Sequence, residues 1–156
     1  MTVLADIVWP GALLADRLMG AISVGVGLIV EAMVLRWAFG MSWLKAIVAD
    51  VAMNAASTVP SAYLVFGGSL AWEFGPGRVL YTLLHIGTFN PITWAATCLL
   101  AVVANTLIEM TVLRLFFKVP FVLRSVAFIA GANAISVVVA FASLTVSPAR
   151  HYHGAV

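Results

Sequence analysis

The sequence contains very little charge. Only 9% of its 156 residues are Asp, Glu, Lys or Arg, whereas soluble domains carry about 25%, and 63% of the residues are hydrophobic. A soluble chain of this size could not cover so much apolar surface with a solvated exterior, so the composition predicts an integral membrane protein. The net charge of +2 is scattered and comes with no aromatic stacking platform, which excludes nucleic acid as the expected partner.

Cysteine is almost absent as well. The single Cys98 lies in an apolar run and cannot form an intrachain disulfide, and no zinc-binding spacing is present. His151 and His153 stand two residues apart near the C-terminus without a neighbouring acid or thiol, which indicates an ordinary tail rather than a metal site. Metalloprotease, nucleophile-elbow and phosphate-loop motifs are missing too. We therefore expect no catalytic residue, no metal and no cofactor.

Long apolar runs are what the sequence does contain. A helix that crosses a bilayer needs about 20 such residues, and helices are the economical solution because lipid offers the backbone no hydrogen bonds. Pro60 and the pair Gly67-Gly68 are expected to kink or interrupt the second run. Four spans are predicted, at 18–38, 44–71, 93–117 and 120–147.

The segment between the second and third spans, 72–92, has a different pattern. Gly75-Pro76-Gly77 predicts a turn, and the following "RVLYTLLHI" predicts a short helix. This helix either lies in the membrane interface or re-enters the membrane, the second being tolerated only when other helices shield it from lipid.

The two halves of the chain repeat one pattern of polar residues. With an offset of 78, Glu31 and Arg36 match Glu109 and Arg114. When the second hairpin tip is lengthened by one residue, Lys45, Asn54 and Ser57 match Arg124, Asn133 and Ser136. Each half holds two spans, so both halves enter the membrane in the same direction, as parallel repeats about a pseudo-twofold axis along the membrane normal.

This repeat defines the expected organisation. We predict an all-α bundle of two helical hairpins within one membrane domain, 1–156. Its parts are the first hairpin 1–71, the connector 72–92, the second hairpin 93–147 and the tail 148–156.

The basic residues predict the orientation. The hairpin tips hold Arg36, Lys45, Arg114, Lys118 and Arg124, whereas the opposite ends hold three basic residues, Arg17, Arg78 and Arg150. Positive charge is enriched on the cytoplasmic side. We therefore expect cytoplasmic tips and both termini on the outer face of a bacterial-type plasma membrane.

Two carboxyl groups are predicted inside the membrane. Glu31 precedes Arg36 by five residues, about 7 Å along a helix, and Glu109 stands in the same place before Arg114. Asn54 and Asn133 fall near the midplane, with Ser57 and Ser136 on the same helix faces. An ionised carboxylate at such depth costs about 2.5–3.5 kcal/mol, which one hydrogen bond does not offset.

Three arrangements would satisfy these carboxyl groups: a well-paired polar network, a protonated glutamate or a water-filled cavity. Arg36, Lys45, Arg114 and Arg124 are expected as charge partners or as contacts to lipid headgroups. Asp50 has no counterpart, since Ile129 occupies the matching position, and it belongs either to an asymmetric site or to a local pair.

Two functions fit this pattern. The first expectation is a non-catalytic accessory or assembly subunit, which packs in the bilayer against a larger membrane complex or a second copy of itself. The alternative is a small transporter or channel in which Glu31, Glu109, Asn54 and Asn133 bind a solute, an ion or a coupling proton.

Overall fold

The computed structural model describes the backbone of residues 3–146 and the side chains of residues 10–144. This part of the chain is helical and contains no strand, which confirms the all-α prediction. The predicted tail 148–156, with His151 and His153, lies outside the described residues. The elements are α1 (Val3–Leu18), α2 (Ala21–Trp37), α3 (Trp43–Trp72), the π-helical segment η1 (Glu73–Gly77), α4 (Arg78–Leu84), α5 (Pro91–Phe117) and α6 (Leu123–Val146).

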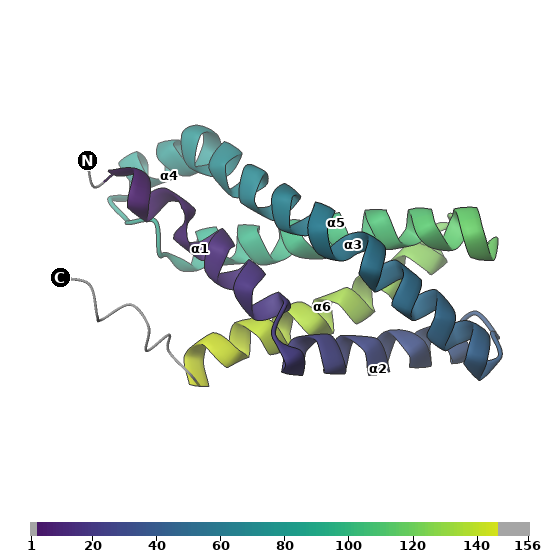
Figure 1. Ribbon diagram of the computed structural model, residues 1–156. Coiled ribbons are helices and arrows are strands. Elements are labelled where there is room, and N and C mark those ends of the chain that lie inside the picture. The colour runs from purple at the N-terminus through teal and green to yellow at the C-terminus, as the bar shows by residue number, and fades with distance from the viewer. Residues whose placement is uncertain (1–2, 147–156) are drawn as a thin grey trace.

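The long helices form a bundle. The short loops after α2 and after α5 lie at one end, on the right in Figure 1, while α4, the start of α1 and the end of α6 lie at the other. Besides its hairpin partner, each long helix has a close neighbour from the other half of the chain: α3 packs against α5, and α2 packs against α6. α1 runs along the bundle and packs against α3 and α6.

Two helices are long and apolar enough to cross a membrane, Pro91–Phe117 and Leu123–Leu144. The segments Pro10–Leu18 and Ala21–Trp37 qualify together, but they are bent by 65°. The predicted first span, 18–38, therefore corresponds to α2 alone, and it is preceded by a helix that we did not expect. α3 falls short of this apolar criterion because polar residues such as Asp50, Asn54, Ser57, Thr58 and Ser61 lower its hydropathy.

Local sequence signals explain where the helices begin and break. The Ser42 side chain accepts a hydrogen bond from Lys45 N at the start of α3, and Asn90 Oδ1 accepts from two backbone amides at the start of α5. Of the two outcomes predicted at Pro60, a kink or an interruption, the interruption does not occur, since α3 continues through this residue as one helix. The break comes at Gly75, whose φ of −115° and ψ of −109° are not helical. The predicted short helix follows as α4.

Two apolar clusters form the core. The first, near the hairpin tips, includes Leu35, Met53, Met110 and Leu113, and the second, near the opposite end, includes Leu14, Val65, Ala101 and Val137. Along α3, α5 and α6, a set of buried polar residues falls between the members of these two clusters. Large apolar side chains also cover the outside of the bundle, among them Leu44, Val51, Tyr63, Leu99, Leu107 and Val138.

Candidate functional site

Glu31 and Asn54 come from neighbouring helices and hydrogen bond to each other. Every fourth residue of α2 from Ser23 to Leu35 is buried, and Glu31 is one of them. It is 2% exposed. Asn54 Nδ2 on α3 donates to Glu31 Oε2 over 2.7 Å. The same nitrogen lies 3.0 Å from Oδ1 of Asp50, one helical turn earlier, and that carboxyl group is also 2% exposed. One amide therefore holds two buried carboxyl groups.

Glu109 on α5 sits in a different arrangement. Its Oε2 accepts a hydrogen bond from Nδ2 of Asn133 on α6, and its Oε1 accepts one from the Ser57 hydroxyl on α3 over 3.2 Å. Glu109 and Asn133 are each 1% exposed. Both oxygens of Glu109 thus accept from an amide or a hydroxyl, whereas Glu31 has one such bond among the described residues.

Ser136 completes the set of predicted polar residues. Its hydroxyl donates to the Ala132 carbonyl, one turn back on α6. It also faces Gly27 of α2, because a Cβ on that glycine would lie 2.9 Å from Ser136 Oγ and 3.7 Å from Glu31 Oε1. The close approach of α2 to α6 therefore places Ser136 beside Glu31, as the α3–α5 contact places Ser57 beside Glu109.

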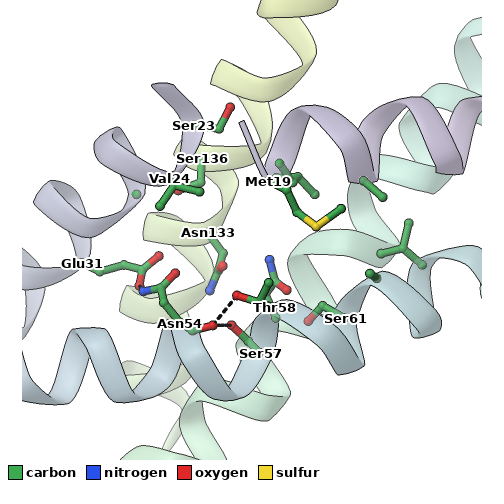
Figure 2. Close-up of a pocket in the computed structure, with 16 residues that line it drawn as sticks. Met19, Ser23, Val24, Glu31, Asn54, Ser57, Thr58, Ser61, Asn133 and Ser136 are labelled. Atoms are coloured by element: carbon green, nitrogen blue, oxygen red, sulfur yellow. Dashed lines mark hydrogen bonds between the residues drawn. The ribbon is translucent and has the colours of Figure 1, made fainter. Parts of the chain in front are cut away.

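A cavity of about 110 Å³ lies beside these groups (Figure 2). Glu31 lines it and Glu109 does not. The Ser61 hydroxyl also lines the cavity, and this buried atom has no hydrogen-bond partner among the described residues. Apolar residues of α1 and of the α1–α2 bend, Ala15, Leu18 and Met19, form one wall. The remaining polar lining comes from Ser23, Asn54, Ser57, Thr58, Asn105, Asn133 and Ser136.

The four basic residues predicted as charge partners lie elsewhere. Lys45, Arg114 and Arg124 are exposed and Arg36 is partly exposed, all near the hairpin tips, and the Arg124 guanidinium lies 5.6 Å from the centre of the Phe128 ring. Within residues 10–144, the hydrogen-bond donors to the side chains of Glu31, Asp50 and Glu109 are asparagine amides and the Ser57 hydroxyl. The described residues contain no group of three His, Cys, Asp or Glu side chains that could hold a metal ion.

Several polar residues in or beside the cavity were not among our site predictions. Asp50 was set aside because it has no counterpart, although its spacing of four residues from Asn54 puts both on one face of α3. Ser61 extends that face by a further turn beyond Ser57. Asn105 stands one turn before Glu109 on α5 and carries the same kind of signal.

A second polar cluster holds the connector to the start of α5. The Tyr81 hydroxyl donates to Glu73 Oε1 over 2.7 Å and lies 2.7 Å from the Thr93 hydroxyl. Asn90 Nδ2 donates to the same Thr93 oxygen over 3.0 Å. Burial raises the pKa of Glu73 above its ordinary value, and the hydrogen bond from Tyr81 partly opposes that rise.

Two larger grooves are lined mainly by apolar or aromatic residues. One of about 460 Å³ between α3 and α5 is lined mainly by small and apolar residues such as Gly68, Ala96, Leu100 and Val103. Another, of about 400 Å³, is lined by Phe89, Trp94 and Phe141, with Cys98 at its edge. Neither contains a charged side chain, so the small cavity is the candidate functional site.

No protein-family model matches this chain, and comparisons with curated proteins and with solved structures find no significant match. Because a helical bundle by itself supports many functions, the argument for function depends on the chemistry of the site.

Proposed function

We propose that the protein is a small integral membrane transporter whose bundle holds a binding site for a small cation or a small polar solute. The observation that carries this proposal is the buried Glu31 carboxyl in the wall of a cavity that also contains the unpartnered Ser61 hydroxyl. A network that served packing alone would satisfy its polar groups and leave no polar space. Unpaired buried polar atoms are costly, so they point to a ligand or to water.

The size and polarity of the cavity narrow the cargo. Drug-sized ligands fill about 300–1,000 Å³, whereas this cavity is about 110 Å³, which suits an ion, a few water molecules or a solute of a few heavy atoms. Carboxyl, amide and hydroxyl oxygens are good acceptors and good ligands for hard cations. With no positive side chain in the lining, an anion is disfavoured.

We further propose that α3 is a membrane span, together with α2, α5 and α6. Its polar side chains are largely inside, since Asp50, Ser57, Ser61 and Ser69 are all buried. Its exposed side includes Leu44, Ile47, Val51, Tyr63 and Leu64. A helix whose polar residues face its neighbours and whose apolar residues face outward suits a bilayer, although its average hydropathy is modest.

The repeated sequence pattern supports a parallel duplication. Glu31 bonds to Asn54 as Glu109 bonds to Asn133, and the α2–α6 contact corresponds to the α3–α5 contact when the halves are exchanged. In this proposal the tips, with Arg36, Lys45, Arg114 and Arg124, face the cytoplasm, and their side chains meet lipid headgroups.

A role as an accessory subunit is the second candidate. It is favoured by the many large apolar side chains exposed on every long helix, which a partner within the membrane could cover as well as lipid could. Copurification from native membranes separates the two: a stoichiometric partner chain supports the subunit, and a monomer or homodimer supports the transporter.

The direct test measures flux in proteoliposomes. Influx of sodium, and in a separate assay of ammonium, is followed for the wild type and for Glu31→Gln, Glu109→Gln and Glu73→Gln. We expect Glu31→Gln to lower the initial rate at least about tenfold while the protein stays folded, because it removes the charge in the cavity wall; such a loss corresponds to about 1.4 kcal/mol. Glu73→Gln is the matched control, since Glu73 is also buried but lies outside the cavity lining.

We expect Glu109→Gln to lower thermal stability more than flux, because both oxygens of Glu109 are used in contacts between helices. Wild-type rates equal to those of empty liposomes for both cations, or unchanged flux in Glu31→Gln, would contradict the proposed transporter.

A further inference from the structure

We infer that Glu31 and Asp50 act as one carboxyl pair that holds a single exchangeable proton, and that this proton leaves through the cavity when a small cation binds. The inference rests on the proposed transport function for its physiological role, and it assigns that function a coupling ion. Its basis is the geometry of three side chains and the asymmetry between the two halves of the chain.

The first step is the convergence of two acids. Asn54 Nδ2 lies 2.7 Å from Glu31 Oε2 and 3.0 Å from Asp50 Oδ1, so the two carboxyl groups meet at one donor, and each residue is only 2% exposed. Two like charges this close and this buried do not both ionise, as in other carboxyl dyads that share one proton.

The second step is that, in the described part of the chain, the hydrogen bonds of the pair involve no cation. From the helices packed around the pair, Glu109 on α5 is the other titratable group, and it is acidic. α6 contributes an amide and a hydroxyl, and α1 contributes apolar side chains to the cavity wall. The residues concerned are Asn133 and Ser136 on α6, and Ala15, Leu18 and the adjoining Met19.

The third step is the route. Glu31 lines the cavity, and Figure 2 shows its carboxyl group directed toward Asn54 beside that space. Asp50 is not part of the lining but contacts Asn54, which is. The buried and unpartnered Ser61 hydroxyl in the same cavity calls independently for a water molecule or another ligand. The proton therefore enters and leaves at Glu31, while Asp50 is the second acid that shares it.

The fourth step is asymmetry. In the second half, Ile129 occupies the position of Asp50 and belongs to the apolar core. Glu109 has no second acid from its own hairpin, accepts two hydrogen bonds and stays outside the cavity wall. The chain therefore has one exchanging pair and one structural glutamate.

The exchange balances simply. The pair, one carboxylic acid and one carboxylate, loses its single proton to cavity water and becomes two carboxylates, and one bound monovalent cation replaces the positive charge that left. Each cycle then moves one positive charge each way, so transport is electroneutral and does not respond to the membrane potential.

Infrared spectroscopy tests the pair directly, without any cargo. In the purified double variant Glu73→Gln/Glu109→Gln, Asp6 and Asp16 are the carboxyl-bearing side chains that remain besides the pair. We expect the C=O band of a protonated carboxylic acid at neutral pH, and its loss when Glu31→Gln and Asp50→Asn are added. A double variant without this band overturns the inference, and so does a band that survives all four substitutions.

Proton release tests the exchange. Sodium or ammonium is added to the wild-type protein in weakly buffered detergent solution, and a pH indicator counts the protons released. We expect about one proton per chain for the wild type and for Glu109→Gln, and none for Asp50→Asn, because an unpaired Glu31 has no shared proton to lose. Release from Asp50→Asn equal to that of the wild type overturns the inference.

The two proposals fail separately. Cation flux in proteoliposomes without the infrared band would support the transporter and contradict the proton-sharing pair. The carboxylic acid band without any cation flux would support the pair and contradict the transporter. If Asp50→Asn folds poorly, the pair is still tested by the proteins that keep both acids: Glu73→Gln/Glu109→Gln in the infrared measurement, and the wild type and Glu109→Gln in the release measurement.

Discussion

Two glutamates with the same sequence context have different surroundings at the level of single residues. Glu31 shares its amide partner with a second acid and borders open polar space, whereas Glu109 is fixed by an amide and a hydroxyl from two other helices. Buried acceptors that lose a donor keep the full desolvation penalty. The residues around Glu109 should therefore matter mainly for stability, and those around Glu31 mainly for binding.

Asn133→Leu tests this division. Leucine is close to asparagine in size but cannot donate to Glu109, so we expect the free energy of unfolding to fall by about 1–3 kcal/mol. Thermal unfolding in detergent, followed by tryptophan fluorescence, measures the change. Asn105→Leu is the control, because Asn105 lines the cavity and makes no hydrogen bond to another described side chain. Equal melting temperatures for the two variants would refute the assignment.

The sequence identified the acids and amides but not all of their partners. The repeat pointed to Glu31, Asn54, Glu109 and Asn133 because polar residues recur there within apolar runs. It could not show that Ser57 reaches across to Glu109, since which helices of the two halves touch depends on packing. Asp50 was undervalued for a related reason: a search for repeated residues overlooks a group present in one copy only.

At the level of helices, the bounds of some elements could be predicted from local sequence and those of others could not. α5 and α6 follow their apolar runs closely, and the Asn90-Pro91 start of α5 is a strong local signal. The N-terminal helix was missed because Pro10 and two aspartates interrupt its apolar pattern. Its 65° angle to α2 is a result of packing against α3 and α6, which no local pattern records.

The connector is the element whose stability should depend on pH. The pKa of Glu73 in the folded protein is raised above its ordinary value of 4.5 by burial. Its stabilising contribution is therefore complete below that ordinary value and is lost as pH rises through the raised pKa. We expect amide exchange in 72–92, corrected for intrinsic rates, to show greater protection in acid than at alkaline pH. Glu73→Gln should flatten this dependence, and an unchanged profile in that variant would be evidence against it.

At the scale of the whole molecule, polar groups are inside and apolar groups outside. The surface exposes large aliphatic and aromatic side chains over all the long helices, while serines, asparagines and four acids are buried in the interior. This distribution is what a bilayer requires of a bundle that carries a polar site. It fits the two helices that are apolar enough to span a membrane.

Orientation is testable by cysteine labelling. Cys98 is first replaced by serine, and Phe121→Cys or Gly87→Cys is then introduced; Phe121 is 42% exposed in the second hairpin tip, and Gly87 is exposed in the connector. With an impermeant thiol reagent on intact cells, we expect Gly87→Cys to react at once and Phe121→Cys to react only after permeabilisation. The reverse pattern would invert the proposed topology.

The two halves carry different residues at one matching position, Asp50 in the first and Ile129 in the second, and this difference has a consequence for separated halves. Two first halves, paired with each other as separate chains, would bring four acids into the interior, where Glu31, Asp50 and Glu109 now lie. Two second halves would supply only their glutamates and no shared proton. Neither half can substitute for the other, and the covalent link between them ensures that every assembled protein receives one of each.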